Sequence, residues 1–325
     1  MKKPALALAL LALALSSQAR GICVLESPAE AEPPANGPVL KGLRIHEWGV
    51  FLAGGKASVA GGGGESPTFV QRVEMPPLPE ASDDPKKRVE CLEPVLHVYA
   101  PKPLDLSVSV SFPSGKPLLA WPRCNPEWTR SASGNQPMLS WSVKAGGEGA
   151  VQPPKVPDEH WIGLARKVGS DLLRSSDGRD AESFLFYEGK VDYAPQVEVR
   201  TQEKGAFGIT SPAVPEAWVV QGGEKPLRGI GRALNEIRGL VQVRPEPVTA
   251  EALRAEFAKA MTAAGLSDKE AGALLGIWMP HLTKPGTRAV YLLPREEYDR
   301  ILPVSFDPAP EELVRVGLVV QEIQP

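Results

Sequence analysis

The segment RIHEWGVF, residues 44–51, contains the most unusual grouping of side chains that could do chemistry. In an extended strand, the period of two places Glu47 on the same face as Ile45, with His46 on the opposite face. If the Ile45 face points into the core, Glu47 is a carboxylate in apolar surroundings. Such a carboxylate either pairs with a cation or has a raised pKa, and a raised pKa is what makes a general acid.

These two outcomes give two interpretations of Glu47. In the first, an arginine such as Arg166 or Arg288 pairs with it and the residue is structural. In the second, Glu47 is the acid/base group of an extracytoplasmic hydrolase, assisted by His46 or His160. We favour the structural interpretation, because ion-pair networks also perturb carboxylates.

Histidines and nucleophilic motifs give little further support for catalysis. Zinc enzymes place two histidine ligands one helical turn apart, and no two histidines of this chain lie that close. The serines form no Gly-x-Ser-x-Gly motif of the kind that marks a nucleophile elbow. The sequence therefore predicts no metal site and no cofactor. The four histidines are His46, His97, His160 and His281.

Five tryptophans are candidates for ligand binding. Exposed indoles could stack on sugar rings or form a partner surface, because aromatic side chains supply large rigid contact areas. The alternative is that they fill the core, since aromatic residues make up only 6% of the chain. The candidates are Trp48, Trp121, Trp128, Trp141 and Trp161.

Three cysteines permit one disulfide and one leftover thiol. Cys91 and Cys124 are the favoured pair, because both fall in a region that reads as folded β structure, whereas Cys23 falls in a leader. Pairing of Cys23 with either partner stays open, because sequence does not fix connectivity.

The elements that must position these residues are mostly short strands. Residues 104–112 alternate between apolar and polar side chains, which predicts a strand with one buried face. Turn residues follow at 113–116, and residues 118–121 can return as the hairpin partner. Proline, with 34 residues, is about twice as frequent as its usual ~5%. We expect a mainly β fold of antiparallel, sandwich-like sheets.

The pattern changes after Pro247. Residues 250–264 carry a helical apolar stripe, and Ser267 with Glu270 forms a capping box that opens a second helix, expected to end at Met279 before a proline. A strand is expected at 313–323. We therefore divide the chain into a β-rich domain, 41–246, and an α+β portion, 247–325, which is either separate or packed on the same sheets.

The first nineteen residues predict export. Two lysines, an Ala/Leu run and a small-x-small ending form a secretory signal peptide, residues 1–19, followed by a flexible leader, residues 20–40. The protein is then secreted or periplasmic, and no further segment predicts a membrane span after cleavage. The formal net charge of −3 does not show the excess of basic residues that is typical of nucleic-acid-binding proteins.

Several short segments resemble a group of secreted bacterial proteins of uncharacterised function. The resemblance rests on HEWG at 46–49, Tyr-Ala-Pro at 99–101, FLFY followed by x-Gly at 184–189, Gly-x-Arg at 286–288 and Ile-Leu-Pro at 301–303. It implies a single architecture across the mature chain and brings no known activity. Val50 and Glu188 depart from the pattern of that group, so a shared site built on those positions is in doubt.

These observations predict an exported protein that binds an envelope or extracellular ligand, such as a glycan or a protein. An extracytoplasmic hydrolase that uses Glu47 is the first alternative, and a structural envelope component is the second.

Overall fold

Alternating side chains make strands the commonest element of this chain, as a computed structural model shows for residues 36–54, 66–75, 88–131 and 134–323. Strands hold 48% of the described residues against 18% in helices, and the helices lie toward the C-terminus. This confirms the predicted mainly β class with antiparallel sheets. The predicted signal peptide, Cys23 and the predicted leader up to residue 35 lie outside the described residues.

The largest sheet has ten strands. In the described ranges, β1 and β19 form its one parallel pair. In spatial order the strands are β16 (Glu246–Pro247), β14 (Leu227–Arg232), β13 (Glu216–Gly222), β17 (Gly286–Leu292), β19 (Ala309–Ile323), β1 (Val39–Ala53), β3 (Arg88–Tyr99), β10 (Leu185–Asp192), β5 (Gly115–Trp121) and β2 (Gln71–Arg72). The portion after residue 247 thus supplies β17 and β19 to the same sheet as β1.

Two smaller sheets complete the β structure. The six-stranded sheet contains β18 (Val304–Asp307), β4 (Leu104–Ser111), β7 (Gly134–Ala145), β8 (Leu173–Ser175) and β9 (Ala181–Glu182) in that order, with β6 (Asn125–Ser131) also paired to β7. The three-stranded sheet contains β11 (Glu198–Thr201), β12 (Phe207–Thr210) and β15 (Val241–Val243).

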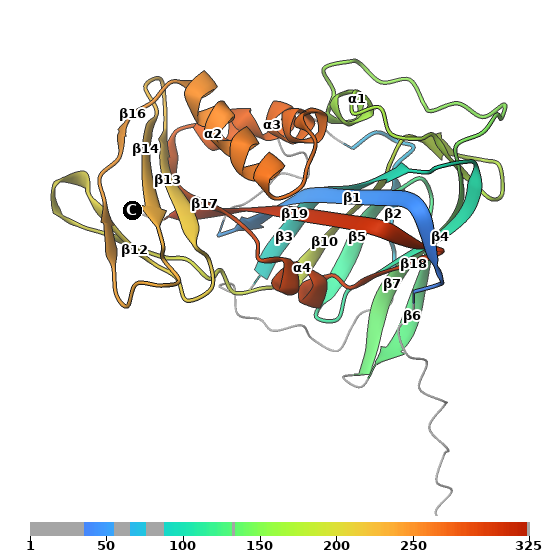
Figure 1. Ribbon diagram of the computed structural model, residues 1–325, viewed down its shortest axis with the longest axis horizontal. Helices are drawn as coiled ribbons and strands as arrows, with labels where there is room; N and C mark the ends of the chain where they lie inside the picture. Colours follow the sequence, from blue (N-terminus) through green and yellow to red (C-terminus); the bar gives the residue numbers. More distant parts are fainter. Residues whose placement is uncertain (1–35, 55–65, 76–87, 132–133, 324–325) are drawn as a thin grey trace, which may run out of the picture. The chain divides into compact units, whose positions relative to one another are not determined.

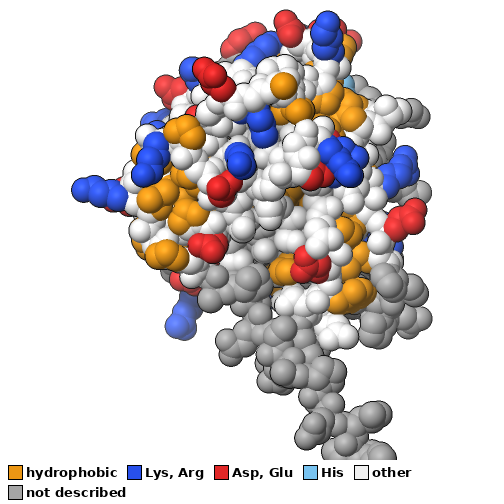
Figure 2. Space-filling view, turned by 90° about the vertical axis from the view of Figure 1, so that its right-hand side faces the viewer, with side chains coloured by type: hydrophobic (Ala, Val, Ile, Leu, Met, Phe, Trp, Pro, Cys, Tyr) orange, Lys and Arg blue, Asp and Glu red, His pale blue; other side chains and the backbone are white. Residues whose placement is uncertain are grey.

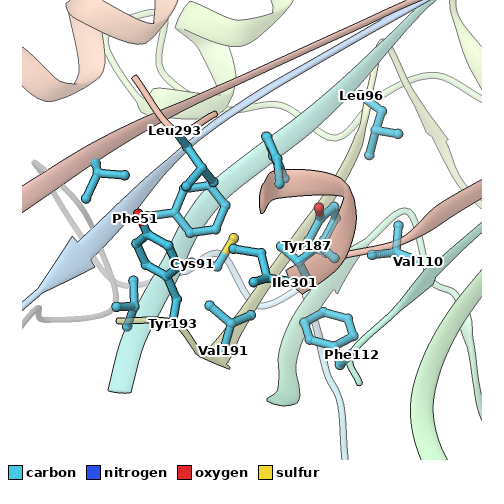
Figure 3. Packing of buried hydrophobic residues seen from close by; sticks show 14 of the residues in the cluster. Phe51, Cys91, Leu96, Val110, Phe112, Tyr187, Val191, Tyr193, Leu293 and Ile301 are labelled. Carbon is cyan, nitrogen blue, oxygen red and sulfur yellow. The ribbon is translucent and has the colours of Figure 1, made fainter. Parts of the chain in front are cut away.

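Helices α1, α2 and α3 lie on one side of the ten-stranded sheet, and α4 lies on the other side with the six-stranded sheet (Figure 1). The helices are α1 (Trp161–Arg166), α2 (Ala250–Ala263), α3 (Asp268–Thr283) and α4 (Arg295–Ile301), and a short 3₁₀ turn spans Glu203–Gly205. The two sides enclose separate apolar layers, which we call the helix-side core and the sheet-side core. Figure 3 shows part of the sheet-side core.

Two local predictions were wrong. The strand at 104–112 exists as β4, but β5 does not return beside it: β4 pairs with β7 and β18, whereas β5 pairs with β10 in the other sheet. The turn between them therefore carries the chain from one layer to the other. The second helix does not stop at Met279, because α3 continues through Pro280 to Thr283.

The predicted capping box of α3 is confirmed. Ser267 is the N-cap of α3, and its side chain and that of Glu270 form the reciprocal capping box.

Among the described residues, no helix combines the length and the apolar character needed to cross a membrane. On the face drawn in Figure 2, basic and acidic side chains are interspersed.

Candidate functional site

Glu47 lies in the sheet-side core and is fully buried. Its cross-strand partner on β19 is Arg315, whose Nε donates to one carboxylate oxygen, while the Tyr187 hydroxyl donates to the other. Arg315 Nη1 also donates to Asp299 Oδ1 of α4 at 2.7 Å, and its guanidinium lies 4.1 Å from the ring centroid of Tyr298. Although burial lowers the pKa of Arg315, the Glu47 charge raises it above its ordinary value. The carboxylate is held by charged and hydroxyl donors and has no contact with solvent.

The arginines expected beside Glu47 bind elsewhere. Arg166 donates two hydrogen bonds to Glu182, and Arg288 donates to Glu322 at 2.9 Å. Sequence reasoning missed Arg315, which is 268 positions away from Glu47. The geometry is that of a structural ion pair, and it gives the acid/base interpretation of Glu47 no support.

His46 points to the helix side of the same strand. Its Nδ1 lies 3.0 Å from Glu270 Oε2, and its Nε2 lies 3.4 Å from Glu312 Oε1 of β19. The Tyr99 hydroxyl donates to the other Glu270 oxygen at 2.8 Å. Burial raises the pKa of Glu270, but hydrogen bonds from His46, the Ser267 backbone and Tyr99 outweigh it and lower the pKa to about 2. This cluster joins α3 to β1 and β3.

The remaining sequence-predicted histidines do not join His46 in a site. His97 is opposite His46 on β3, but burial lowers its pKa to about 4, and its Nδ1 bonds Ser170 Oγ at 2.8 Å. His160 is the N-cap of α1, where its Nδ1 accepts the Ile162 N–H at 3.2 Å. In the described ranges, no group of three or more His, Cys, Asp or Glu side chains could hold a metal ion.

Four of the five candidate tryptophans are core residues. Trp48, Trp121, Trp141 and Trp161 are each at most 9% exposed, and only Trp128 reaches 38%. The Trp141 indole donates to Pro122 O at 2.8 Å, and the Trp121 indole donates to Glu182. A stacking platform of several tryptophans is therefore not formed in the described part of the chain.

Within the described residues, Cys91 and Cys124 do not form the predicted disulfide, because both are free thiols there. Cys91 is buried in the sheet-side core, where Figure 3 shows it among apolar side chains. It is opposite Gly189 of β10, which in turn is opposite Pro117 of β5. Two strand spacings of ~4.8 Å thus separate Cys91 from β5, and Cys124 lies beyond the end of β5, whereas a disulfide needs Cα atoms within ~7 Å.

Two buried glutamates lie where β3 and β10 are both irregular. Glu93 has a left-handed φ of 52°, is 1% exposed, and has no hydrogen-bond partner for either carboxyl oxygen. Burial raises its pKa well above 4.5. Burial likewise raises the pKa of Glu188 to about 8, although the Glu93 backbone N–H favours its charged form. The Glu188 carboxyl is therefore mostly neutral at pH 7, and the burial of both carboxyls leaves them out of reach of a ligand.

A polar groove opens where β7 changes partner. On one edge of β7, the residues up to Ser140 pair with β6, which starts at Asn125, and the residues from Val143 onward pair with β8, which ends at Ser175. The break leaves a hollow of about 470 Å³. Its walls come from β6 (Asn125, Glu127), β7 (Ser140–Ser142), the end of β8 (Ser175) and the loop after it (Ser176, Asp177, Arg179), with Gln71, Arg123 and Cys124 beside them.

Each charged group of the groove has a partner. Arg123 donates two hydrogen bonds to Asp180, at 2.8 and 2.7 Å, and Asp180 raises the pKa of Arg123. Arg179 Nε lies 3.5 Å from Asp177. Glu127 accepts the hydroxyl of Ser140 at 3.0 Å. Serine, asparagine and glutamine side chains supply further hydrogen-bonding groups to the groove.

Sequence reasoning missed this groove. One signal was present: Ser140 and Ser142 lie two positions apart on a strand, so the period of two places both hydroxyls on one face. A comparison with family models, curated proteins and solved structures found no match for this chain.

Proposed function

We propose that this is an exported protein that binds a small polar ligand of the cell envelope or the medium in the groove beside β7. The groove carries the proposal, because it is a hollow of about 470 Å³ walled by serine, asparagine, glutamine, glutamate and arginine side chains. Ligand sites are commonly ~300–1,000 Å³, with a few placed polar groups that fix the ligand. The export signal predicted from residues 1–19 and the resemblance to secreted bacterial proteins support an extracytoplasmic ligand.

The scaffold of the groove favours binding without a large rearrangement. Two of its walls are paired strands, and Arg123 is held in place by two bonds to Asp180. The Cys124 N–H donates to Gln71 Oε1 at 2.8 Å, which orients the Gln71 amide. Groups that are already ordered lose less conformational freedom on binding, so more of the contact energy appears as affinity.

The experiment is a thermal-shift screen of the mature protein against envelope and medium components, repeated on two phenylalanine variants. Ser142→Phe fills the groove from β7. Ser107→Phe is the matched control, because Ser107 is opposite Ser142 on β4 and is also exposed, but does not line the groove.

We expect a ligand that raises the Tm of the parent protein and of Ser107→Phe, but not that of Ser142→Phe. An equal Tm shift in both variants would show that the ligand binds somewhere else.

A further inference from the structure

We infer that the groove selects an uncharged, hydroxyl-rich ligand, in chemical terms a neutral mono- or disaccharide. The inference rests on the proposed function and names the ligand class of the same site. It follows from how the charges and hydroxyls of the groove are arranged.

The two arginines are already matched by carboxylates. Arg123 forms a bidentate pair with Asp180, and Arg179 faces Asp177. The Ser175 hydroxyl, which donates to Asp177 at 2.6 Å, and the Arg179 backbone N–H lower the pKa of Asp177, so that carboxylate stays charged at neutral pH. An anionic ligand would have to compete with these carboxylates for the guanidinium groups.

The other walls suit ligand hydroxyls. Glu127 is held by neutral donors, the Asn125 amide and the Ser140 hydroxyl. A carboxylate held in this way still has lone pairs free to accept from a ligand. A serine hydroxyl both donates and accepts, as a sugar hydroxyl does, and Ser140 and Ser142 present theirs along one strand. The walls therefore alternate donors and acceptors over a short distance.

The size and the lack of an aromatic platform also fit a small sugar. The volume of about 470 Å³ lies in the lower half of the range for ligand sites. Trp141 is 2% exposed and its indole N–H is committed to Pro122 O. Trp128 follows Glu127 on β6, so strand alternation directs it to the opposite face. Recognition thus depends on hydrogen bonds more than on stacking.

The test is isothermal titration of the mature protein with three classes of probe. The neutral class is glucose, galactose, mannose, N-acetylglucosamine, maltose and lactose; the anionic probe is glucuronate and the cationic probe is glucosamine. Ser142→Phe blocks the groove, and Glu127→Ala provides a second variant that does not depend on the fold tolerating a phenylalanine. Removing one charge-assisted hydrogen bond is expected to weaken binding about ten-fold or more.

The expected result is saturable binding of at least one neutral sugar and at least ten-fold weaker binding of glucuronate and glucosamine. Binding of the neutral sugar should be lost in Ser142→Phe and weakened about ten-fold or more in Glu127→Ala. Stronger binding of glucuronate or glucosamine that is lost in Ser142→Phe would overturn the inference and leave the proposed function standing. Sugar binding that both variants retain would overturn both the inference and the proposed function. Absence of binding by every neutral sugar would overturn the saccharide assignment.

Discussion

Replacing Glu188 with glutamine should stabilise the protein, and by an amount that grows with pH. Glu188 is 2% exposed, and burial raises its pKa from the ordinary 4.5 to about 8. Between these two values the folded chain holds a proton that the unfolded chain has released. The folded state therefore binds more protons, and its stability falls as pH rises.

The magnitude follows from the size of the pKa difference. Each pKa unit corresponds to ~1.4 kcal/mol, so between pH 4.5 and pH 7 the Glu188 carboxyl lowers the free energy of unfolding by about 3 kcal/mol. Glutamine keeps a carbonyl oxygen that can accept the Glu93 N–H, but it does not titrate. Glu188→Gln should thus match the parent near pH 4.5 and exceed its stability by about 3 kcal/mol at pH 7.

Urea unfolding of the protein at pH 5, 6, 7 and 8 measures this difference. Glu93 also has a raised pKa, so it adds a pH dependence to the free energy of unfolding of both proteins. The quantity to compare is therefore the difference in the free energy of unfolding between the parent and Glu188→Gln at each pH. Glu159→Gln is the control, because Glu159 is exposed. A difference in the free energy of unfolding that is the same at all four pH values would refute the reasoning, as would a fall in the stability of Glu188→Gln relative to the parent as pH rises.

Three further predictions concern stability, each measured by urea unfolding at pH 7. Arg315→Met should cost about 3–5 kcal/mol, because it leaves Glu47 buried without its cation, and adding Glu47→Leu should recover part of the loss. Trp141→Ala should cost about 3–5 kcal/mol, whereas Trp128→Ala should cost less than about 1 kcal/mol; equal losses would contradict the burial of Trp141. Ser267→Ala should cost about 1 kcal/mol through loss of the N-cap, and an unchanged midpoint would count against the capping box.

Local patterns predicted local structure well. The alternation at 104–112 became β4, and the capping box of Ser267 and Glu270 opens α3. Both signals involve residues within a few positions of one another. The hairpin prediction failed because nothing local shows that the chain changes layers after β4.

The site was much harder to predict, because long-range pairing builds it. Glu47 meets Arg315 through the register of the parallel pair of β1 and β19. The requirement that a buried carboxylate has a cationic partner does not single out Arg315, because the chain has many other arginines. The groove depends on the gap along β7 between the residues that pair with β6 and those that pair with β8, so three separate segments build it. Residue types restrict such a site, but only the strand register locates it.

The HEWG segment shows why an unusual motif need not mark a binding site. Its two ionisable residues serve opposite faces of β1: His46 ties the sheet to α3 through Glu270, and Glu47 ties it to β19 and α4 through Arg315. Gly49 is equally constrained, because a Cβ atom there would lie 2.9 Å from the Pro94 Cα.

The FLFY segment is constrained in the same way. The Tyr187 hydroxyl bonds Glu47, and a Cβ atom at Gly189 would lie 2.5 Å from a ring carbon of Phe112. These residues hold the layers together, and none of them lines the groove. Proteins that share the motifs are therefore expected to share the packing of the layers, while the side chains beside β7 are free to differ and to set a different ligand.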